Sequence, residues 1–300
     1  MDQQIDPTVQ FEAERARLFS LAYRFLGNRH DAEDAVQEAW IRLSTADRVE
    51  IDNLGGWLTT VLSRICLNVL RTRQRRPITL ADDLDHVART PVDLPVTPEQ
   101  QVVLADSLGP ALLVVLDALN PAERIALVLH DIFSVSFEDV AAVLGKSEQA
   151  CRQLASRARR RVRTAQDPAF DPERQRHIVT AFLRAAKSGE FQTLLSLLSP
   201  DVTLAADPAA VAIGAPELLI GPDAVAGRFS GGARAARAAF VDGLAGLVWA
   251  QGGRAKVVFD FTISNGRVTR IEMVSDEDVL GEMEIDYLGR PDRGDAEAGP

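Results

Sequence analysis

The sequence predicts a multidomain protein with two all-α domains followed by a C-terminal α+β domain. The first all-α domain is indicated by two consecutive segments with apolar residues at helical spacing between residues 31 and 76. The second is indicated by two short helical segments joined at Gly145. The α+β domain is indicated by four apolar runs after residue 238, with the hairpin dipeptide Asn265-Gly266 between the last two. The expected bounds are 1–76, 108–166 and 172–280, with a linker at 77–107 and a disordered tail at 281–300.

Charge is segregated along the chain, although the formal net charge is −10 over 300 residues. Leu54–Arg76 contains five arginines and no acidic residue, and Lys146–Arg163 contains seven basic residues against Glu148. The compensating acids lie in residues 81–107 and after Ser275. Such asymmetry indicates a polyanionic partner for the two basic segments.

The sequence lacks the motifs of several common classes of enzyme and metal-binding protein. Cys66 and Cys151 fall on apolar helix faces, where we expect small buried side chains, and they form no CxxC pair. There is no His/Cys cluster with zinc spacing, glycine-rich phosphate loop, HExxH or GxSxG. An N-terminal apolar h-region and a bilayer-length apolar run are also missing. We therefore expect a cytoplasmic protein with no membrane partner, no metal and no cofactor.

The stretch DAEDAVQEAWIRL, Asp31–Leu43, is expected to be a helix capped by Asp31, with one apolar and one acidic face. The apolar face consists of Ala32, Ala35, Val36, Ala39, Trp40 and Leu43. The other face consists of Asp34, Gln37, Glu38 and Arg42, with Ile41 in its middle. Solvent gives no reason for an isoleucine there, so a partner is indicated. The alternative is an ordinary solvated face.

The stretch LGGWLTTVLSRICLNVLRTRQRR, Leu54–Arg76, is expected to be a second helix with a basic face. Its buried stripe is expected to consist of Leu58, Val61, Leu62, Ile65, Cys66 and Val69. Another face is lined by Thr60, Arg64, Asn68, Arg71 and Arg75. Trp57 lies where the apolar stripes of the two helices meet. A solvated face ordinarily mixes both signs of charge, so two faces of opposite sign indicate two different partners.

This pair of helices resembles region 2 of the extracytoplasmic-function (ECF) group of sigma-70 family transcription initiation factors. The resemblance implies that the acidic helix binds core RNA polymerase through Asp34, Gln37, Glu38 and Ile41. It implies that the basic helix melts and reads the downstream promoter element through Trp57, Thr60, Arg64, Asn68, Arg71 and Arg75. Trp57 is either a stacking platform for an unpaired base or a core residue. Many relatives carry Asn at the position of Arg64 and Asp at the position of Asn68.

Residues 77–107 are acidic and rich in proline, which favours a linker with little helix. One interpretation is a flexible tether. In the sigma family, the corresponding linker runs through the polymerase active-site region and the RNA exit path. The resemblance therefore leaves a second interpretation, in which the acidic segment mimics nucleic acid.

A helix-turn-helix is predicted near the end of the second all-α domain. Before it, Asn120 caps a helix that has Pro121 in its first turn. The first helix of the motif begins at Ser136 and ends at Gly145, and Ser147 caps the second, Glu148–Thr164. Its exposed face is expected to carry Gln149, Arg152, Gln153, Ser156, Arg157, Arg160 and Arg161. Long donors of this kind reach base edges and phosphates in a major groove.

The stretch LNPAERIALVLHDIFSVSFEDVAAVLGKSEQACRQLASRARRRV resembles sigma region 4, which reads the upstream promoter element. The resemblance implies base contacts by Arg152, Gln153, Ser156 and Arg157, and phosphate contacts mainly by Arg160 and Arg161. Two such modules in this order indicate a sigma factor more specifically than either alone.

The C-terminal segment after the hinge Asp167–Pro172 is expected to form helices and then a curved antiparallel sheet, an α+β cone. We expect helices at 173–187, 191–198 and 222–235, and a first strand at 202–206. The stretch VDGLAGLVWAQGGRAKVVFDFTISNGRVTRIEMVSDEDVL carries a resemblance to the SnoaL-like domain fused to one ECF subgroup. The subgroup's glycine-rich signature after the first strand is absent, and Asp207-Pro208-Ala209-Ala210-Val211 stands there.

Three functions are compatible with these patterns. The favoured one is an initiation factor, not an enzyme, whose SnoaL-like domain docks on the sigma domains and regulates them in cis. The second is a cyclase-like enzyme, for which Asp207, Asp242 and Asp260 are candidate acid/base residues, each more often found in a turn or on a solvent-facing strand. The third is a DNA-binding regulator that senses a small ligand, and it leaves the acidic helix Asp31–Leu43 unexplained.

Overall fold

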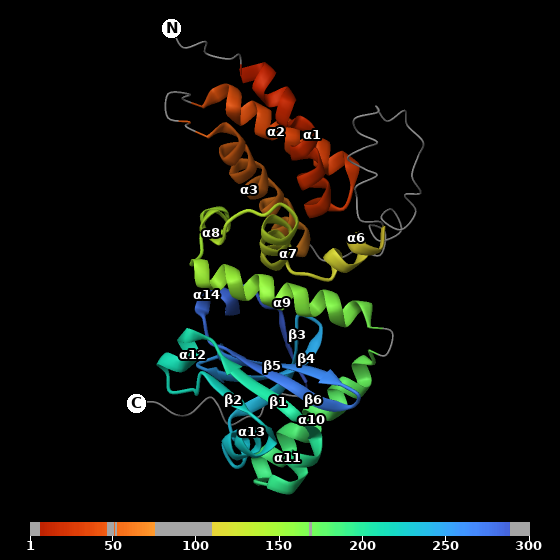
Figure 1. The fold of residues 1–300 in the computed structure, drawn as a ribbon, viewed down its shortest axis with the longest axis vertical. Coiled ribbons are helices and arrows are strands. Elements are labelled where there is room, and N and C mark those ends of the chain that lie inside the picture. Colours follow the sequence, from red (N-terminus) through yellow and green to blue (C-terminus); the bar gives the residue numbers. More distant parts are fainter. Residues whose placement is uncertain (1–6, 47–50, 52, 76–109, 168–169, 289–300) are drawn as a thin grey trace. The chain divides into compact units, whose positions relative to one another are not determined.

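The computed structural model of this protein describes residues 7–46, 51, 53–75, 110–167 and 170–288. The chain forms two compact units, Met1–Gln166 and Asp167–Pro300, which we call the N-terminal unit and the C-terminal unit (Figure 1). The predicted linker at 77–107 lies outside the described residues, so its two interpretations stay open.

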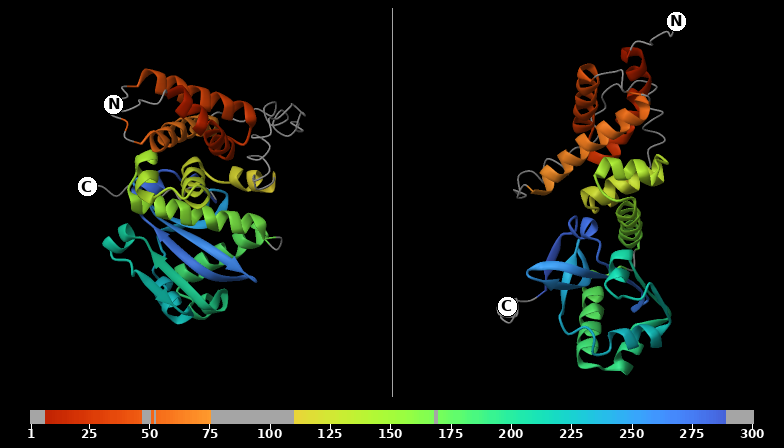
Figure 2. Two further views of the ribbon diagram at one scale, coloured as in Figure 1. Left: turned by 45° about the horizontal axis from the view of Figure 1, so that its top comes forward. Right: turned by 90° about the vertical axis from the view of Figure 1, so that its left-hand side faces the viewer.

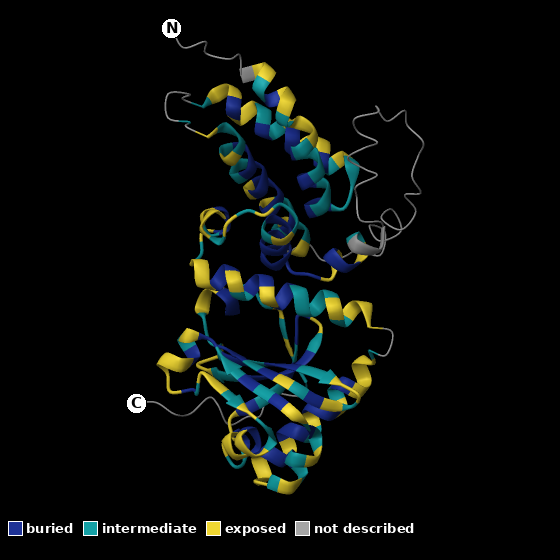
Figure 3. Ribbon diagram, viewed as in Figure 1, coloured by how far each residue is buried: buried dark blue, intermediate teal, exposed yellow. Residues whose placement is uncertain are grey.

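The N-terminal unit begins with three helices that share one core. They are α1 (Pro7–Leu26), α2 (Arg29–Thr45) and α3 (Leu54–Arg75). Buried residues lie on the sides where these helices face one another (Figure 3). Large side chains at the centre of this core are Leu18, Leu21, Phe25, Leu43, Leu58 and Leu62. The predicted buried stripes of both helices are largely confirmed, although Val61 and Val69 are only half-buried.

The prediction that Asp31 caps the second helix is wrong. Gly27 ends α1 in the left-handed region, with a φ of 77°, and Asn28 follows as the N-cap of α2. The Asn28 side-chain oxygen accepts a hydrogen bond from the backbone N–H of Asp31 at 2.8 Å. The acidic helix therefore begins two residues earlier than Asp31, because the tight turn at Gly27 leaves room for only one capping residue.

Four α-helices and a π-helical turn complete the described part of the N-terminal unit. They are α6 (Pro110–Asp117), α7 (Pro121–Leu127), η2 (Val128–Ile132), α8 (Phe137–Leu144) and α9 (Glu148–Gln166). The predicted start of α7 is confirmed, because Asn120 and Glu123 form a reciprocal capping box. The helix-turn-helix is α8 and α9, with Gly145 left-handed at a φ of 66° and Ser147 Oγ accepting from Ala150 N–H at 3.0 Å.

The two helical sets of the N-terminal unit pack together as one body. Arg124 on α7 is buried and donates from Nη1 to the carbonyl oxygen of Phe25 at 2.9 Å, near the end of α1. The same nitrogen lies 3.0 Å from the Asp117 carboxylate. Burial lowers the pKa of Arg124, and the contact with Asp117 opposes that shift. A buried guanidinium thus ties α7 to α1.

The C-terminal unit combines helices with one mixed sheet, which confirms the predicted α+β architecture. Its helices are α10 (Pro172–Ser188), α11 (Phe191–Leu197), α12 (Pro208–Ala212), α13 (Pro222–Phe229) and α14 (Glu277–Leu280). Its strands are β1 (Leu198–Ala206), β2 (Leu218–Ile220), β3 (Ala236–Val241), β4 (Leu244–Gln251), β5 (Arg254–Ser264), β6 (Arg267–Val274) and β7 (Ile285–Tyr287). The strand order is β2-β1-β6-β5-β4-β3-β7. Strands β1 and β6 pair in parallel, so the prediction of an antiparallel sheet is wrong for this pair.

The sheet curves around α10, which lies along its concave face (Figure 2). Phe182 on α10 is fully buried between Phe229 and Phe261, with ring centroids 5.0 and 5.3 Å away in edge-to-face geometry. Such aromatic pairs add to the stabilisation that burial of the rings already gives. The cluster holds the helical layer against the sheet.

The predicted hairpin at Asn265-Gly266 is confirmed. Asn265 and Gly266 have φ values of 52° and 76°, the pair of positive angles that a two-residue type I′ turn requires. Strands β5 and β6 pair antiparallel from Ser264 and Arg267 outward. The expected helix at 222–235 is shorter than predicted, because it ends at Phe229.

The prediction of a disordered tail from residue 281 is wrong at 285–287. These residues form β7, which pairs antiparallel with β3, Val241 opposite Ile285 and Ala239 opposite Tyr287. Without this pairing β3 would present a row of unsatisfied N–H and C=O groups at the sheet edge. The described tail segment therefore covers an edge strand.

Candidate nucleic-acid and partner interfaces

The acidic face of α2 is present as predicted from the sequence. Asp34, Gln37 and Ile41 are exposed and Glu38 is half-buried. Ile41 is 48% exposed and lies among these polar side chains. Glu38 pairs with Arg42 one turn later at 3.0 Å, an exposed ion pair of small net energy. The face thus has Ile41 at its centre, and the weak ion pair between Glu38 and Arg42 beside it can rearrange when a partner binds.

The basic face of α3 is partly accessible. Arg64 and Asn68 are exposed, whereas Trp57, Thr60 and Arg71 are half-buried. Thr60 Oγ1 donates to the Gly56 carbonyl at 3.0 Å within the helix. Arg75 closes α3, and its side chain is outside the described part of the structure.

Arg64 makes a contact that its position in the sequence does not predict. Its Nη2 donates to the carbonyl oxygen of Ala142 on α8 at 2.6 Å, which joins the basic helix to the first helix of the helix-turn-helix. One of the predicted promoter contacts is therefore engaged within the N-terminal unit.

Arg73 was not selected from the sequence and has a structural role. It donates to the Leu26 carbonyl from Nη1 at 3.1 Å and pairs with the Asp31 carboxylate. These bonds fix the end of α3 against the turn between α1 and α2. Nearby Cys66 is buried, and burial raises the pKa of its thiol, so the side chain stays protonated and unreactive.

The exposed part of α9 is narrower than predicted. Arg152 and Ser156 are exposed, and Gln153 and Arg160 are half-buried. Arg152 pairs with the Glu148 carboxylate one turn earlier, with both side chains nearly half exposed. Such a pair costs little to break, so Arg152 is available to an anionic partner.

The prediction that Arg157 and Arg161 lie on the exposed face of α9 is wrong. Arg157 is only 2% exposed, and its Nε lies 3.2 Å from Oε1 of Glu123, which is fully buried. Arg161 Nη1 lies 2.5 Å from the other carboxylate oxygen, and Nη2 donates to the Ala118 carbonyl. A buried carboxylate is costly unless charged donors satisfy it. Both arginines therefore hold the Glu123 carboxylate.

A signal for this burial is present in the sequence. Arg157 follows Leu154 by three residues and Ala150 by seven, and both of these are fully buried. This spacing places it on the inner face of the helix. The prediction placed Arg157 on the exposed face because of its charge, but the helical spacing from Ala150 and Leu154 places it on the buried face.

Arg159, between these positions, is also occupied within the fold. Its Nε and Nη2 each lie 2.7 Å from an oxygen of the Asp131 carboxylate. This bidentate hydrogen bonding raises the pKa of Arg159. The second helix of the motif thus uses three of its arginines to hold α7 and η2.

Two of the three candidate acid/base residues of the C-terminal unit have structural roles. The Asp207 carboxylate accepts from the backbone N–H groups of Ala210, Ser275 and Asp276 at 2.6, 2.8 and 3.0 Å. Asp242 lies in the β3–β4 turn at a φ of 50°, and its carboxylate accepts a hydrogen bond from the backbone N–H of Glu284 at 2.9 Å. Asp260 is buried on β5, which corrects the expectation of a turn or solvent-facing position.

The described residues show neither a metal site nor a membrane-spanning helix. Within them no group of three or more His, Cys, Asp or Glu side chains is placed to hold a metal ion. No described helix combines the length and apolarity needed to cross a bilayer.

Comparisons with known proteins assign both helical sets of the N-terminal unit to known families. The model described as Sigma-70 region 2 matches residues 10–76, and the model described as Sigma-70, region 4 matches residues 110–162. A probable ECF RNA polymerase sigma factor, SigI of Mycobacterium tuberculosis (strain CDC 1551 / Oshkosh), is 40% identical over 204 residues, 66% of this chain and 69% of SigI. The chain belongs to the ECF RNA polymerase sigma factors.

Two further relatives come from the same bacterial species. The ECF RNA polymerase sigma factor SigJ of M. tuberculosis (strain ATCC 25618 / H37Rv) is 47% identical over 203 residues, 66% of this chain. The match spans 64% of the length of SigJ. A crystal structure of M. tuberculosis SigJ covers 92% of this chain, is itself covered to 98%, and shares 34% identity at a TM-score of 0.40.

In this ECF sigma factor, α1–α3 carry region 2 and α6–α9 carry region 4. The acidic α2 and the basic α3 both belong to region 2, and the helix-turn-helix belongs to region 4. The C-terminal unit lies outside both matched regions.

Proposed function

We propose that this chain binds core RNA polymerase, recognises a specific promoter, opens it and starts transcription, and that its C-terminal unit regulates these steps in cis. The observation that carries the proposal is the presence of regions 2 and 4, in that order, with an acidic face on α2 and basic side chains on α3 and α9. The chain acts by binding and catalyses no reaction of its own.

Ile41 is the centre of the proposed polymerase contact. Interfaces gain most of their energy from a few apolar anchors that become fully buried, surrounded by polar residues that exclude water. Ile41 is the exposed apolar side chain of α2, and Asp34, Gln37 and Glu38 lie around it. The acids favour a basic groove on the polymerase and set the orientation of the contact.

The upstream promoter element is read by the first half of α9. Arg152 and Ser156 are exposed there, and Gln153 lies between them. Recognition helices contact base edges through their N-terminal residues, and arginine reads guanine by two hydrogen bonds. Arg160 contacts phosphates. Arg157 and Arg161 contribute indirectly, because they fix α9 on α7.

The downstream element is contacted by α3, and this requires a change within the N-terminal unit. Arg64 Nη2 donates to the Ala142 carbonyl, and this bond holds the guanidinium against α8. Separation of α3 from α8 frees Arg64 for the opened strand, next to Asn68 and Arg71.

The C-terminal unit is proposed to dock on regions 2 and 4 and to bias this separation. It follows Asp167–Pro172, which the sequence predicts to be a hinge, and the carboxylates of Asp207 and Asp242 are engaged in backbone hydrogen bonds. A coupling of about 1–3 kcal/mol between the docked and active arrangements changes activity some five- to a hundredfold.

Permanganate footprinting of a promoter bubble tests the proposal. The full chain and a version ending at Gln166, each saturating core polymerase, are compared on one supercoiled template. Opening by both proteins, to different extents, is the expected result. Equal promoter opening by the two proteins would contradict regulation by the C-terminal unit. No promoter opening by either protein would contradict the proposed role in initiation.

A further inference from the structure

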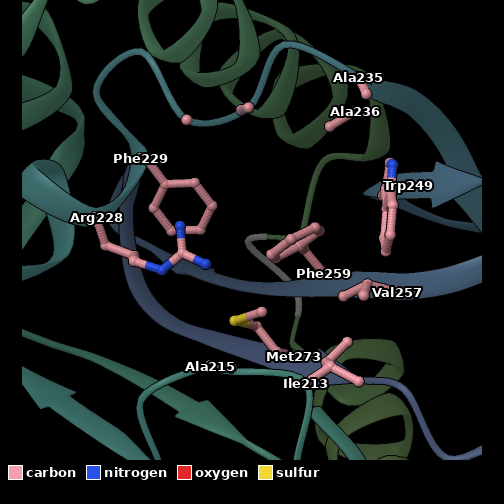
Figure 4. Close-up of a pocket in the computed structure, with 12 residues that line it drawn as sticks. Ile213, Ala215, Arg228, Phe229, Ala235, Ala236, Trp249, Val257, Phe259 and Met273 are labelled. Atoms are coloured by element: carbon pink, nitrogen blue, oxygen red, sulfur yellow. The ribbon is translucent and has the colours of Figure 1, made fainter. Parts of the chain in front are cut away.

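The C-terminal unit contains a cavity that the proposed function does not use. It has a volume of about 230 Å³ and lies between the end of α13, the loop that follows it, and strands β4, β5 and β6 (Figure 4). Its lining residues include Phe229, Trp249, Phe259 and Met273. The cavity belongs to this unit alone, so its geometry does not depend on regions 2 and 4.

The lining is apolar with one charged exception. Phe229 and Met273 are buried, Trp249 and Phe259 are half-buried, and the ring centroids of Phe229 and Phe259 lie 5.6 Å apart. Arg228 is the charged residue of the lining, and no acidic residue belongs to it. Figure 4 shows its guanidinium extending beside the ring of Phe229 toward the open space.

Arg228 is placed to receive an anion. Its side chain is exposed, and no hydrogen bond or ion pair to another described residue engages its guanidinium. Gly232 lies on the loop beside it, and a Cβ added there would lie 3.7 Å from Arg228 Nη1 and 3.0 Å from the Arg228 carbonyl oxygen. The absence of a side chain there keeps space open beside the guanidinium. A planar fork of donors at the rim of an apolar cavity matches a carboxylate attached to an apolar body.

We propose that this cavity binds a small organic monoanion, a single aromatic ring that bears one carboxylate on a short arm. The ring lies among Phe229, Phe259 and Met273, and the carboxylate meets Arg228. An apolar cavity of about 150 Å³ accommodates benzene, so 230 Å³ accommodates a ring with a short substituent.

Charge selection by Arg228 is expected to be moderate, because the guanidinium is exposed. Solvent weakens its attraction for a carboxylate compared with that of a buried pair. The cavity should therefore prefer an acid over its neutral amide by about five- to tenfold. Binding is a property of this unit, so it is measured separately from transcription, and its failure leaves the proposed initiation activity untouched.

The test is a ligand-observed NMR titration of the full chain with phenylacetate and, in parallel, with phenylacetamide. Phenylacetate should bind with a dissociation constant below about 2 mM, as expected for ten non-hydrogen atoms that are well enclosed. Phenylacetamide should bind about five- to tenfold more weakly. Saturation transfer should be stronger to the ring protons than to the methylene group.

Three variants separate the contributions. Arg228→Gln should bind the acid and the amide equally, whereas Arg254→Gln, an exposed arginine outside the lining, should behave as wild type. Ala233→Leu should fill the cavity and weaken both ligands, with the thermal unfolding midpoint as a check that the domain is folded. Equal affinity of the wild type for acid and amide, an unchanged preference in Arg228→Gln, or no binding of either ligand at 10 mM would overturn the proposal.

Discussion

Arg157 Nε lies 3.2 Å from Glu123 Oε1, and the two side chains are 3% and 0% exposed. An arginine of the recognition helix thus pairs with the residue that closes the capping box of α7. Arg161 approaches the other oxygen of the same carboxylate. The helix that is proposed to read DNA is therefore fixed to α7 by arginines, the residue type that it also offers to DNA.

Replacement of Arg157 should destabilise the N-terminal unit. Loss of one partner from a buried ion pair costs about 3–5 kcal/mol, and Arg161 remains to satisfy part of the Glu123 charge, so we expect about 2–3 kcal/mol for Arg157→Ala. Chemical denaturation followed by circular dichroism measures this change. Arg152→Ala, which removes an exposed pair, should change stability by less than about 1 kcal/mol. Equal stability of both variants would contradict the structural role of Arg157.

The face of α2 should carry the polymerase contact. Ile41→Ala combined with Glu38→Lys should weaken binding to core polymerase at least tenfold, because an apolar anchor and a complementary charge are both lost. Val9→Ala is the matched control, since Val9 is an exposed apolar residue on α1. Fluorescence anisotropy of a labelled chain gives the affinities. If the control weakens binding as much as the double variant does, the assignment of α2 is wrong.

Arg152 and Arg160 should affect promoter binding in different ways. Arg152→Ala should relax the base preference at one position of the upstream element, by about 1–3 kcal/mol. Arg160→Ala should weaken all sequences alike and reduce the dependence of affinity on salt. A binding-site selection at two salt concentrations distinguishes these outcomes, and the reverse pattern would refute the assignment.

Regions 2 and 4 should separate when the polymerase binds. Fluorophores at Thr72→Cys on α3 and Glu138→Cys on α8 report this distance, because both positions are exposed and lie outside the proposed contacts. Energy transfer should fall when core polymerase is added, since the bond from Arg64 to the Ala142 carbonyl must break. Unchanged transfer at saturating core would mean that the packed arrangement is also the active one.

The two native cysteines should not interfere with such labelling. Cys66 and Cys151 are buried, and the raised pKa of Cys66 keeps its thiol protonated at pH 8. Iodoacetamide should therefore modify neither thiol in the native chain and both in guanidinium chloride. Mass spectrometry counts the adducts, and rapid modification of the native protein would show that the helical core opens.

Local signals predicted much of this fold because they depend on residues close in sequence. The capping box at Asn120 and the turn at Asn265-Gly266 require only a few residues each. The burial of Arg157 depends on Glu123, which is 34 positions away, and β7 depends on an edge strand formed more than 40 residues earlier. The cavity beside Arg228 could not be predicted, because α13, β4, β5 and β6 form it together. Long-range pairing, rather than composition, decides these features.

Run-off transcription from a randomised promoter library tests the central claim most directly. Core polymerase alone, core with the full chain, and core with the Glu38→Lys, Ile41→Ala variant are compared, and transcript 5′ ends are sequenced. We predict that the full chain directs initiation at a fixed distance downstream of one shared pair of sequence elements, and that the variant does not. Transcripts with no shared elements, or the same transcripts from core alone, would contradict the assignment of this chain as a sigma factor.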